Sequence, residues 1–453
     1  MDSLISSPYW SFLVLLLSIL LVAQLISRWR FHPFIALVIA AVFVGLISPD
    51  LVRDRGLIAA IELPMTELGS MAGKIAWVIA LAAVIGTAMM ESGAASQIVS
   101  QLLKRLGDKQ AGLALMLAGF ILSIPVFLDT VFFLLIPLGI TLAAKTGKDY
   151  VLYVTAIGGG AAITHSIVPP TPGPLIMAET LGLDLGLVIS TGLLLGILPA
   201  FVVLFVGKKL NRALRIPLRI APAPIVAGGK ELSLGLSLLP ILLPILLIGA
   251  ASLVEALTGS VPEWLGFLGN KNLAMAAGTA VALYLWAITR DLQSTVLWEK
   301  IGKPLEIGGL IILITSAGGA YGAMIGHTGI GEAIRLSSEN LQLHYIPLAW
   351  LIAAVLKTAQ GSGTVAMISS AAIISALIGD GSELPYHPVY LLMAMGFGSL
   401  FVSWMNDSAF WVVARMSGLT EKEALKTWTF LLAIISLAGM LQVWLLSWIV
   451  PLI

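Results

Sequence analysis

Long apolar segments recur along this sequence, and they constrain its fold more than any other feature. Runs of about 20 apolar residues match the hydrocarbon thickness of a lipid bilayer. We interpret as membrane spans the segments near residues 10–28, 31–48, 70–91, 185–207, 234–257, 272–289, 304–326 and 427–450. Because lipid offers no partner for unpaired backbone groups, such spans are expected to be helices. The sequence therefore predicts an all-α integral membrane protein.

The composition agrees with a membrane protein and argues against several other classes. Of the 453 residues, 58% are hydrophobic and only 11% are charged, whereas a soluble domain has roughly a quarter charged. The net charge of +1 leaves no basic domain for nucleic acid. The chain has no Cys for disulfide or thiol chemistry. It also has no G-x-x-x-x-G-K-[ST] loop and no H-E-x-x-H motif, so we expect no enzyme, no cofactor and no metal.

Four further apolar regions carry a polar interruption near their middle. Regions 111–144 and 348–379 are about 33 residues long, and each is either two crossings or one re-entrant hairpin. Regions 149–181 and 386–416 are predicted to be discontinuous helices. Polar groups at membrane depth are tolerated only in protein or beside a cavity, so each interruption is a candidate site.

The basic residues test the topology, because cytoplasmic loops are enriched in Lys and Arg. With the N-terminus outside and both long interrupted regions re-entering, most of the 25 basic residues lie on the inner side. Lys357 lies inside the membrane. The outer side keeps Arg53, Arg55, Lys74, Lys271 and Arg335. Both termini are then predicted to lie on the outer side.

The two halves of the chain resemble each other around a polar segment at residues 208–233. This segment is predicted to be a cytoplasmic linker, which either fixes the orientation or binds lipid headgroups. It separates a first membrane repeat, 1–207, from a second, 234–453. Matched residues at nearly one offset are Gly93 and Gly329, Thr130 and Thr364, and Gly160 and Gly398. The charge pattern makes the repeats inverted, as in many secondary transporters, although small-residue-rich helices also match by chance.

In the first half, the interruptions are S-I-P-V-F-L-D-T-V at 123–131 and T-H-S-I-V-P-P-T-P-G-P at 164–174. Asp129 is either a helix cap or a carboxylate that gains and loses a proton, and Thr130 is a candidate substrate ligand. Prolines stop the next helix after Thr164, His165 and Ser166, which are expected to form one wall of a substrate site. His165 is a further candidate for proton coupling, or it only packs.

In the second half, the hairpin interruption is L-K-T-A-Q-G-S-G-T-V at 356–365. Lys357 either offsets the charge of an anion or pairs with an acidic side chain. The remaining candidate ligands there are Gln360, Ser362, Gly363 and Thr364, because hydroxyl, amide and backbone N–H groups at a helix N-terminus suit a carboxylate.

The last interruption is S-W-M-N-D-S-A-F-W at 403–411. Asn406 is a candidate substrate ligand, and Asp407 is a candidate for proton coupling. The alternative is a structural Asn-Asp pair that caps a helix. Such pairs also suit Na⁺, so this segment does not separate proton coupling from sodium coupling.

These stretches together resemble the gluconate–proton symporter (gluconate permease) family, a branch of the ion transporter superfamily, over nearly the whole chain. The most specific motif is T-H-x-x-x-P-P-x-P-G-P at 164–174, followed in the expected order by G-S-x-T-V-A at 361–366 and N-D-x-x-F-W at 406–411. Asp129 stands where the family usually has Glu, and Lys357 where it tends to have Arg, so both charges are kept.

The resemblance implies a proton-coupled secondary transporter of the bacterial inner (plasma) membrane that imports a small hydroxy-carboxylate, gluconate or a related sugar acid. It further implies a scaffold plus a transport domain, and a homodimer. The family includes carriers of D-serine. Other interpretations are a Na⁺-coupled organic-anion or D-serine carrier, a passive anion channel, and a membrane receptor.

Overall fold

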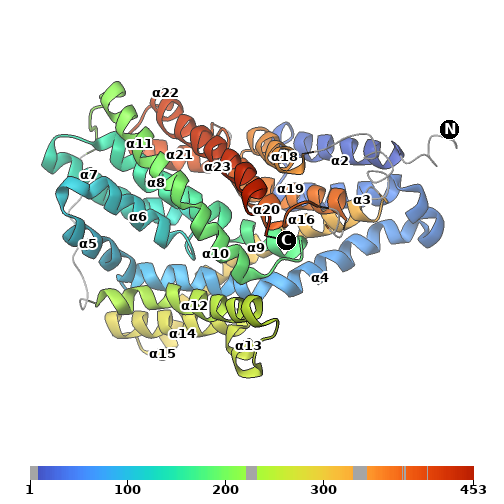
Figure 1. Ribbon diagram of the computed structural model, residues 1–453, viewed down its shortest axis with the longest axis horizontal. Helices are drawn as coiled ribbons and strands as arrows, with labels where there is room; N and C mark the ends of the chain where they lie inside the picture. Colours follow the sequence, from blue (N-terminus) through green and yellow to red (C-terminus); the bar gives the residue numbers. More distant parts are fainter. Residues whose placement is uncertain are drawn as a thin grey trace.

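The regular elements of the protein are helical throughout the part that the computed structural model describes, which is residues 9–220, 232–329, 344–379, 381, 384–405 and 407–452 (Figure 1). The all-α prediction is confirmed for these residues. The elements are α2 (Tyr9–Ser27), α3 (Pro33–Ile47), α4 (Pro49–Glu91), α5 (Ala94–Leu106), η1 (Asp108–Gln110), α6 (Ala111–Leu122), α7 (Leu128–Thr146), α8 (Tyr150–Ile167), α9 (Pro172–Thr180), α10 (Leu185–Leu195), α11 (Ile197–Leu214), α12 (Leu234–Thr258), α13 (Glu263–Gly269), α14 (Lys271–Arg290), α15 (Ser294–Lys300), α16 (Gly302–Gly326), α18 (Tyr345–Gln360), α19 (Gly363–Ile378), α20 (Val389–Gly398), α21 (Ser408–Met416), α22 (Glu421–Ala424), η2 (Leu425–Thr429) and α23 (Phe430–Ile449).

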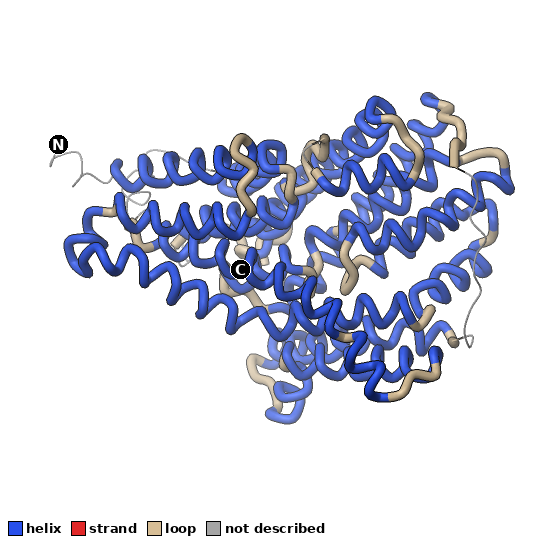
Figure 2. The backbone as a smooth tube through the Cα atoms, turned by 180° about the vertical axis from the view of Figure 1, so that it is seen from behind, coloured by secondary structure: helices blue, strands red, loops and turns tan. Residues whose placement is uncertain are grey.

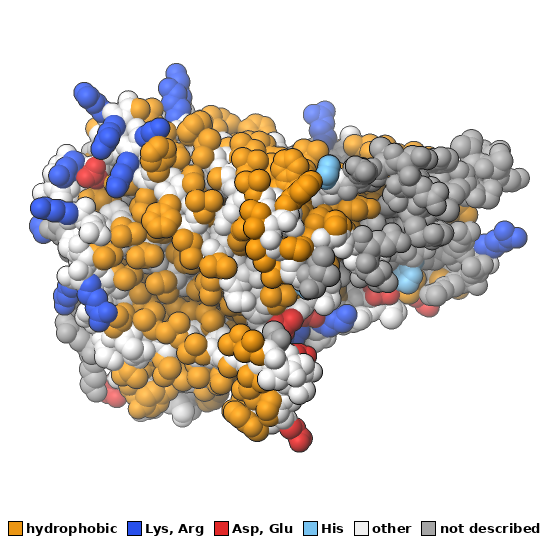
Figure 3. Space-filling model, in the orientation of Figure 1, with side chains coloured by type: hydrophobic (Ala, Val, Ile, Leu, Met, Phe, Trp, Pro, Cys, Tyr) orange, Lys and Arg blue, Asp and Glu red, His pale blue; other side chains and the backbone are white. Residues whose placement is uncertain are grey.

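Eight helical segments in the described part of the chain are long and apolar enough to cross a bilayer. Figure 3 shows apolar side chains over the middle of the visible face, with most of the visible Lys and Arg side chains gathered at one end. An apolar band with charges beyond it is the surface that a membrane-embedded helical protein requires.

The four predicted interruptions are breaks between helices. Figure 2 shows the helices in blue with loops between them in tan. They separate α6 from α7, α8 from α9, α18 from α19, and α20 from α21. Two predicted boundaries differ from the structure. Helix α4 begins well before residue 70 and bends at Gly56, which has a φ of 80°, and α11 continues past residue 207 to Leu214. The beginning of the predicted linker is therefore helical.

The longest helix, α4, runs along the molecule and separates two groups of helices. Figure 1 shows α12 to α15 on one side of α4 and the remaining helices on the other. On its surface α4 packs against α3, α14 and α16. Helix α16 in turn packs against α19, so α19 is connected to α4 through α16.

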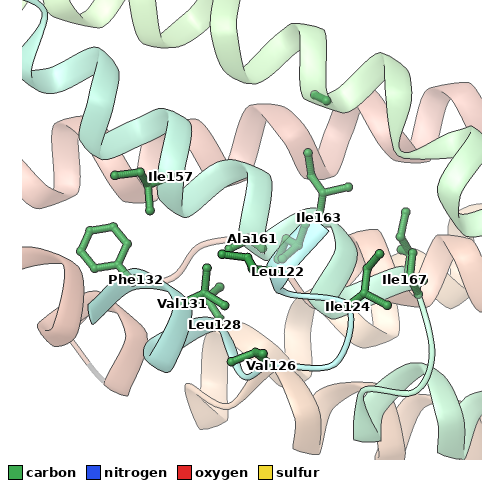
Figure 4. Packing of buried hydrophobic residues seen from close by; sticks show 14 of the residues in the cluster. Leu122, Ile124, Val126, Leu128, Val131, Phe132, Ile157, Ala161, Ile163 and Ile167 are labelled. Atoms are coloured by element: carbon green, nitrogen blue, oxygen red, sulfur yellow. The ribbon is translucent and has the colours of Figure 1, made fainter. Parts of the chain in front are cut away.

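Helix α6, which ends at the first break, packs closely against α8. At Gly119 of α6, an added Cβ would lie 2.6 Å from the carbonyl oxygen of Ile157 on α8, and Gly160 of α8 lies equally tightly against the α6 backbone. Figure 4 shows Leu122, Val131 and Phe132 around Ile157 and Ala161 in the same buried cluster. This packing places the start of α7 beside the end of α8.

Candidate functional site

A cavity of about 380 Å³ lies where the four helix breaks meet. Small-molecule sites span roughly 300–1,000 Å³, so the cavity has the size of a small-ligand site. Of the residues predicted from sequence, those that line it are Asp129, Thr130, His165, Ser166, Lys357, Ser362, Gly363, Thr364 and Asp407. Each break contributes at least one of these side chains, although the breaks are far apart in the sequence.

Three helices begin at this cavity. The first residues of α7, α19 and α21, which are Leu128, Gly363 and Ser408, all line it. The first turn of a helix has backbone N–H groups without intrahelical partners and carries a partial positive charge. Three such ends around one cavity make it favourable for an anion.

The caps of these helices differ from one another. Ser362 caps α19 by accepting a hydrogen bond from the Val365 N–H at 3.3 Å, and Asp407 caps α21 by accepting one from the Ala409 N–H at 3.0 Å. Helix α7 has no side-chain cap, because its N-cap position is Phe127. The possible capping role of Asp129 is therefore wrong: the helix begins one residue before it, at Leu128.

Lys357 and Asp407 form a buried ion pair at the edge of the cavity. Lys357 Nζ donates to Asp407 Oδ2 at 2.6 Å and to the Gly361 carbonyl oxygen at 2.6 Å. The two side chains are only 5% and 6% exposed. The pairing of Lys357 with an acidic side chain, one of two roles considered from sequence, is thus present.

Asp407 belongs to a larger hydrogen-bonded network. Its Oδ2 also accepts a hydrogen bond from Ser403 Oγ, which in turn accepts one from Trp428 Nε1 at 2.8 Å. Thr429 donates to the Ser403 carbonyl oxygen. Trp428 and Thr429 lie in η2, a π-helical turn at the start of α23, and this turn directs both neighbouring side chains toward Ser403. Asp407 therefore keeps its position through several donors besides Lys357.

Asp129 and His165 have far fewer partners. Asp129 is half-buried and lines the cavity, and its carboxylate accepts no hydrogen bond from any described residue. The His165 ring stands edge-on to Phe127, with 6.3 Å between ring centroids, and its Nδ1 has no partner in the described part of the chain. Both side chains face the cavity without being fixed by the surrounding protein.

Three residues predicted as ligands do not line the cavity or lie outside the described residues. Thr164 is buried, and its Oγ1 donates to the Phe120 carbonyl oxygen at 2.8 Å, which ties α8 to α6. Gln360 is 7% exposed, and neither amide atom has a partner among the described residues. Asn406 lies outside the described residues.

Several residues that line the cavity are not predicted by the sequence motifs. Phe127, Ser399 and Trp428 line the cavity beside the predicted groups. Ile307 and Ile311 of α16 add an apolar wall. Ser399 and Trp428 have no distinctive sequence neighbourhood, because their position depends on the end of α20 and on the π-helical turn.

A second cavity of about 400 Å³ lies at the opposite end of α19. Helices α9, α16 and α19 end there, so their partial negative charges face it. Its charged lining is Glu67, Lys74 and Glu179. Lys271 pairs with Glu179, and His327 Nε2 lies 3.3 Å from Glu67 Oε1. This cavity is electrostatically less suited to an anion than the first.

The motifs around the first cavity belong to a known group of permeases. Residues 10–449 match the family model described as GntP family permease. The chain belongs to the GntP permease family. It is therefore a multi-pass membrane permease and not an enzyme.

Named relatives of this GntP-family permease are similar over nearly their full length. The gluconate permease of Pseudomonas aeruginosa is 32% identical over 448 residues, covering 95% of this chain and 96% of the relative. The D-serine transporter DsdX of Escherichia coli K12 is 32% identical over 455 residues, covering 98% and 100%. One name gives gluconate as the substrate and the other gives D-serine, although both relatives are 32% identical to this chain.

Solved structures support the same fold. The YdaH transporter of Alcanivorax borkumensis has a TM-score of 0.67 at 15% identity, covering 93% of this chain and all of that chain. At this identity the likeness concerns the fold alone. The helical arrangement of the GntP-family permease is thus one that transporters are known to adopt.

Proposed function

We propose that this permease is a proton-coupled symporter that imports gluconate or a related sugar acid across the bacterial inner membrane. The observation that carries the proposal is the cavity itself. It combines three helix N-termini, a Lys, an unbonded carboxylate and several hydroxyl groups. The helix N-termini and the Lys suit an anion, the hydroxyl groups suit the hydroxyl groups of a sugar acid, and the carboxylate suits proton coupling. The gluconate permeases among the relatives agree with a hydroxylated anion as substrate.

The substrate carboxylate is assigned to the N-termini of α19 and α21. Ser362 and Thr364 lie on the first of these, and the backbone of Gly363 leaves room for close approach of a ligand. Lys357 lies beside them, paired with Asp407. Backbone N–H groups at helix ends bind anions without a large desolvation cost, because they are already fixed in place.

The substrate hydroxyl groups are assigned to Thr130 of α7 and Ser166 of α8, which both line the cavity. Each hydroxyl side chain can donate one hydrogen bond and accept others, which suits the hydroxyl groups of a sugar acid. His165, which also lines the cavity, adds a ring nitrogen.

Asp129 is our first choice for the proton carrier. An unbonded carboxylate beside an incoming anion is repelled by it, and a proton on Asp129 removes that repulsion. Asp407 ranks behind Asp129, because its carboxylate already accepts hydrogen bonds from Lys357, Ser403 and the Ala409 N–H. His165 ranks behind Asp129, because it does not carry the negative charge that the substrate must overcome.

The proposed architecture is an inverted repeat with a re-entrant hairpin and a broken helix in each half. The hairpins are α6–α7 and α18–α19, and the broken helices are α8–α9 and α20–α21. Their convergence on one cavity supports this organisation, which is common in secondary transporters. A moving domain built from these elements, a scaffold around α4 and a homodimer are parts of the same proposal.

The proposal is tested by uptake into proteoliposomes. With an inward proton gradient and no Na⁺, the wild-type chain is expected to accumulate radiolabelled gluconate above equilibrium. Asp129→Asn is expected to abolish this accumulation while preserving exchange of labelled for unlabelled gluconate, because the site remains but carries no proton. Uphill uptake by Asp129→Asn at the wild-type rate contradicts the role of Asp129.

Two alternatives have distinct outcomes in the same assay. Accumulation that requires Na⁺ at fixed pH indicates a sodium-coupled carrier, and flux that never exceeds equilibrium indicates a channel. Because DsdX is as similar as the gluconate permease, D-serine is the first competitor to test against labelled gluconate.

A further inference from the structure

Lys357, which lines the cavity, is already paired with other groups of the protein. Lys357 Nζ contacts Asp407 Oδ2 and the Gly361 carbonyl oxygen, both at 2.6 Å. Lys357 is the only Lys or Arg among the described residues that line the cavity. A substrate carboxylate that approaches Lys357 therefore meets an ion pair with no net charge.

The two partners of this ion pair do not depend on it equally. Without Lys357, Asp407 still accepts hydrogen bonds from Ser403 Oγ and from the Ala409 N–H at the start of α21. Without Asp407, the one hydrogen-bond partner of Lys357 among the described residues is the Gly361 carbonyl oxygen. An uncompensated buried charge is strongly destabilising. Lys357 therefore requires a carboxylate, whereas Asp407 has other donors and can release the lysine.

The exchange of one carboxylate for another satisfies this requirement. We propose that Asp407 is an internal competitor of the substrate: the substrate carboxylate takes the place of Asp407 on Lys357, and Asp407 stays on Ser403 and Ala409. This inference rests on the proposed function, and it assigns Asp407 to setting substrate affinity instead of carrying the proton. A ligand without a carboxylate cannot replace Asp407 and is excluded.

The position of the pair adds a structural consequence. Lys357 lies in the last turn of α18, and Asp407 caps α21, so the ion pair ties the tip of the second hairpin to the second broken helix. Trp428 and Thr429 hold the Asp407 side of this tie through Ser403. When the substrate carboxylate binds Lys357, the contact between α18 and α21 is replaced by a contact between α18 and the substrate.

The first test is gluconate binding to purified Asp407→Asn in detergent, measured by calorimetry. Asparagine is close in shape but removes the carboxylate that is hydrogen-bonded to Lys357, so the competitor is removed; the Asp129 carboxylate, which also acts on Lys357 electrostatically, is the same in both proteins. We expect gluconate to bind at least about tenfold more tightly than to the wild type, because its carboxylate no longer displaces another. Sorbitol, which has the hydroxyl groups but no carboxylate, is expected to bind neither protein.

The matched control is Glu423→Gln. This substitution also removes a carboxylate from an ion pair, that with Arg219 at 2.6 Å, but Glu423 does not line the cavity. Its gluconate affinity is expected to equal that of the wild type. Unchanged or weaker gluconate binding by folded Asp407→Asn, with wild-type binding intact, overturns the inference but leaves the proposed function standing.

A second variant covers the case in which Asp407→Asn does not fold. The double substitution Lys357→Gln with Asp407→Asn removes both charges and leaves neither partner unpaired, so folding is expected to be retained. If Lys357 receives the substrate carboxylate, this variant binds gluconate at least about tenfold more weakly than the wild type. Wild-type affinity in the double variant shows that the pair is only structural and overturns the inference. If the wild-type protein does not bind gluconate, both the proposed function and this inference are contradicted.

Discussion

Thr164 and Ser166 lie two positions apart at the end of α8, yet their hydroxyl groups face different surroundings. Thr164 Oγ1 is used inside the protein, where it donates to the Phe120 carbonyl oxygen of α6. Ser166 lines the cavity. The same residue chemistry therefore contributes to helix packing at one position and is available for a ligand at the other.

This difference predicts that one conservative substitution lowers stability and the other lowers substrate affinity. Thr164→Val is expected to lower the free energy of unfolding by about 1–3 kcal/mol, because it leaves a buried carbonyl without its partner. Gluconate affinity is expected to stay unchanged. Ser166→Ala is expected to weaken gluconate binding and leave thermal stability nearly as in the wild type. Thermal unfolding in detergent and calorimetry measure both, and equal behaviour of the two variants contradicts the assignment.

At the scale of single elements, the contact between α6 and α8 determines where the break between α6 and α7 lies. Gly119 permits this contact because its position has no room for a side chain. The close approach brings Asp129, at the start of α7, beside the end of α8. The position of Asp129 in the cavity thus depends on a glycine ten residues earlier.

Gly119→Ala is expected to destabilise the protein by about 1–3 kcal/mol and to lower the midpoint of thermal unfolding, because backbone atoms must move apart. Gly69→Ala is the matched control. Gly69 is an exposed helical residue of α4 with nothing within 4 Å of an added Cβ, so alanine there is expected to be neutral or stabilising by about 0.5–1 kcal/mol. If Gly119→Ala is as stable as Gly69→Ala, the close contact between α6 and α8 at Gly119 is contradicted.

At the scale of the whole molecule, charge distribution predicts the orientation in the membrane. Most of the Lys and Arg side chains visible in Figure 3 lie at the end of the molecule where α7 and α11 lie. By the positive-inside rule, this end is predicted to face the cytoplasm. Helix α14 is predicted to cross the membrane, with exposed Glu263 at the start of α13 before it and exposed Lys300 at the end of α15 after it.

Because the chain has no Cys, single-cysteine variants can test this orientation directly. A membrane-impermeant maleimide added from outside is expected to label Glu263→Cys in intact spheroplasts. Lys300→Cys is expected to react only after the membrane is permeabilised. The reverse pattern contradicts the predicted topology, including the placement of both termini on the outer side.

The sequence by itself determined the membrane character, the helical class and the four breaks, because each has a local physical cause. Apolar length requires helices in lipid, and helix-breaking residues such as Pro169, Pro170 and Gly361 lie at the breaks, although Pro137 and Pro240 are accommodated inside helices. Most of the polar residues at the breaks were also correctly expected to lie together. The inverted repeat and the re-entrant hairpins stay predictions of the charge pattern and the matched residues.

Only the tertiary structure decided which partner each polar group has. Lys357 and Asp407 are 50 positions apart, and the sequence left open whether the lysine faces an anion or an acid. Ser403 and Trp428 join that pair through a π-helical turn with no sequence signature. The convergence of three helix N-termini likewise depends on packing between distant segments. Long-range contacts have no local cause, so they become visible only when the chain is folded.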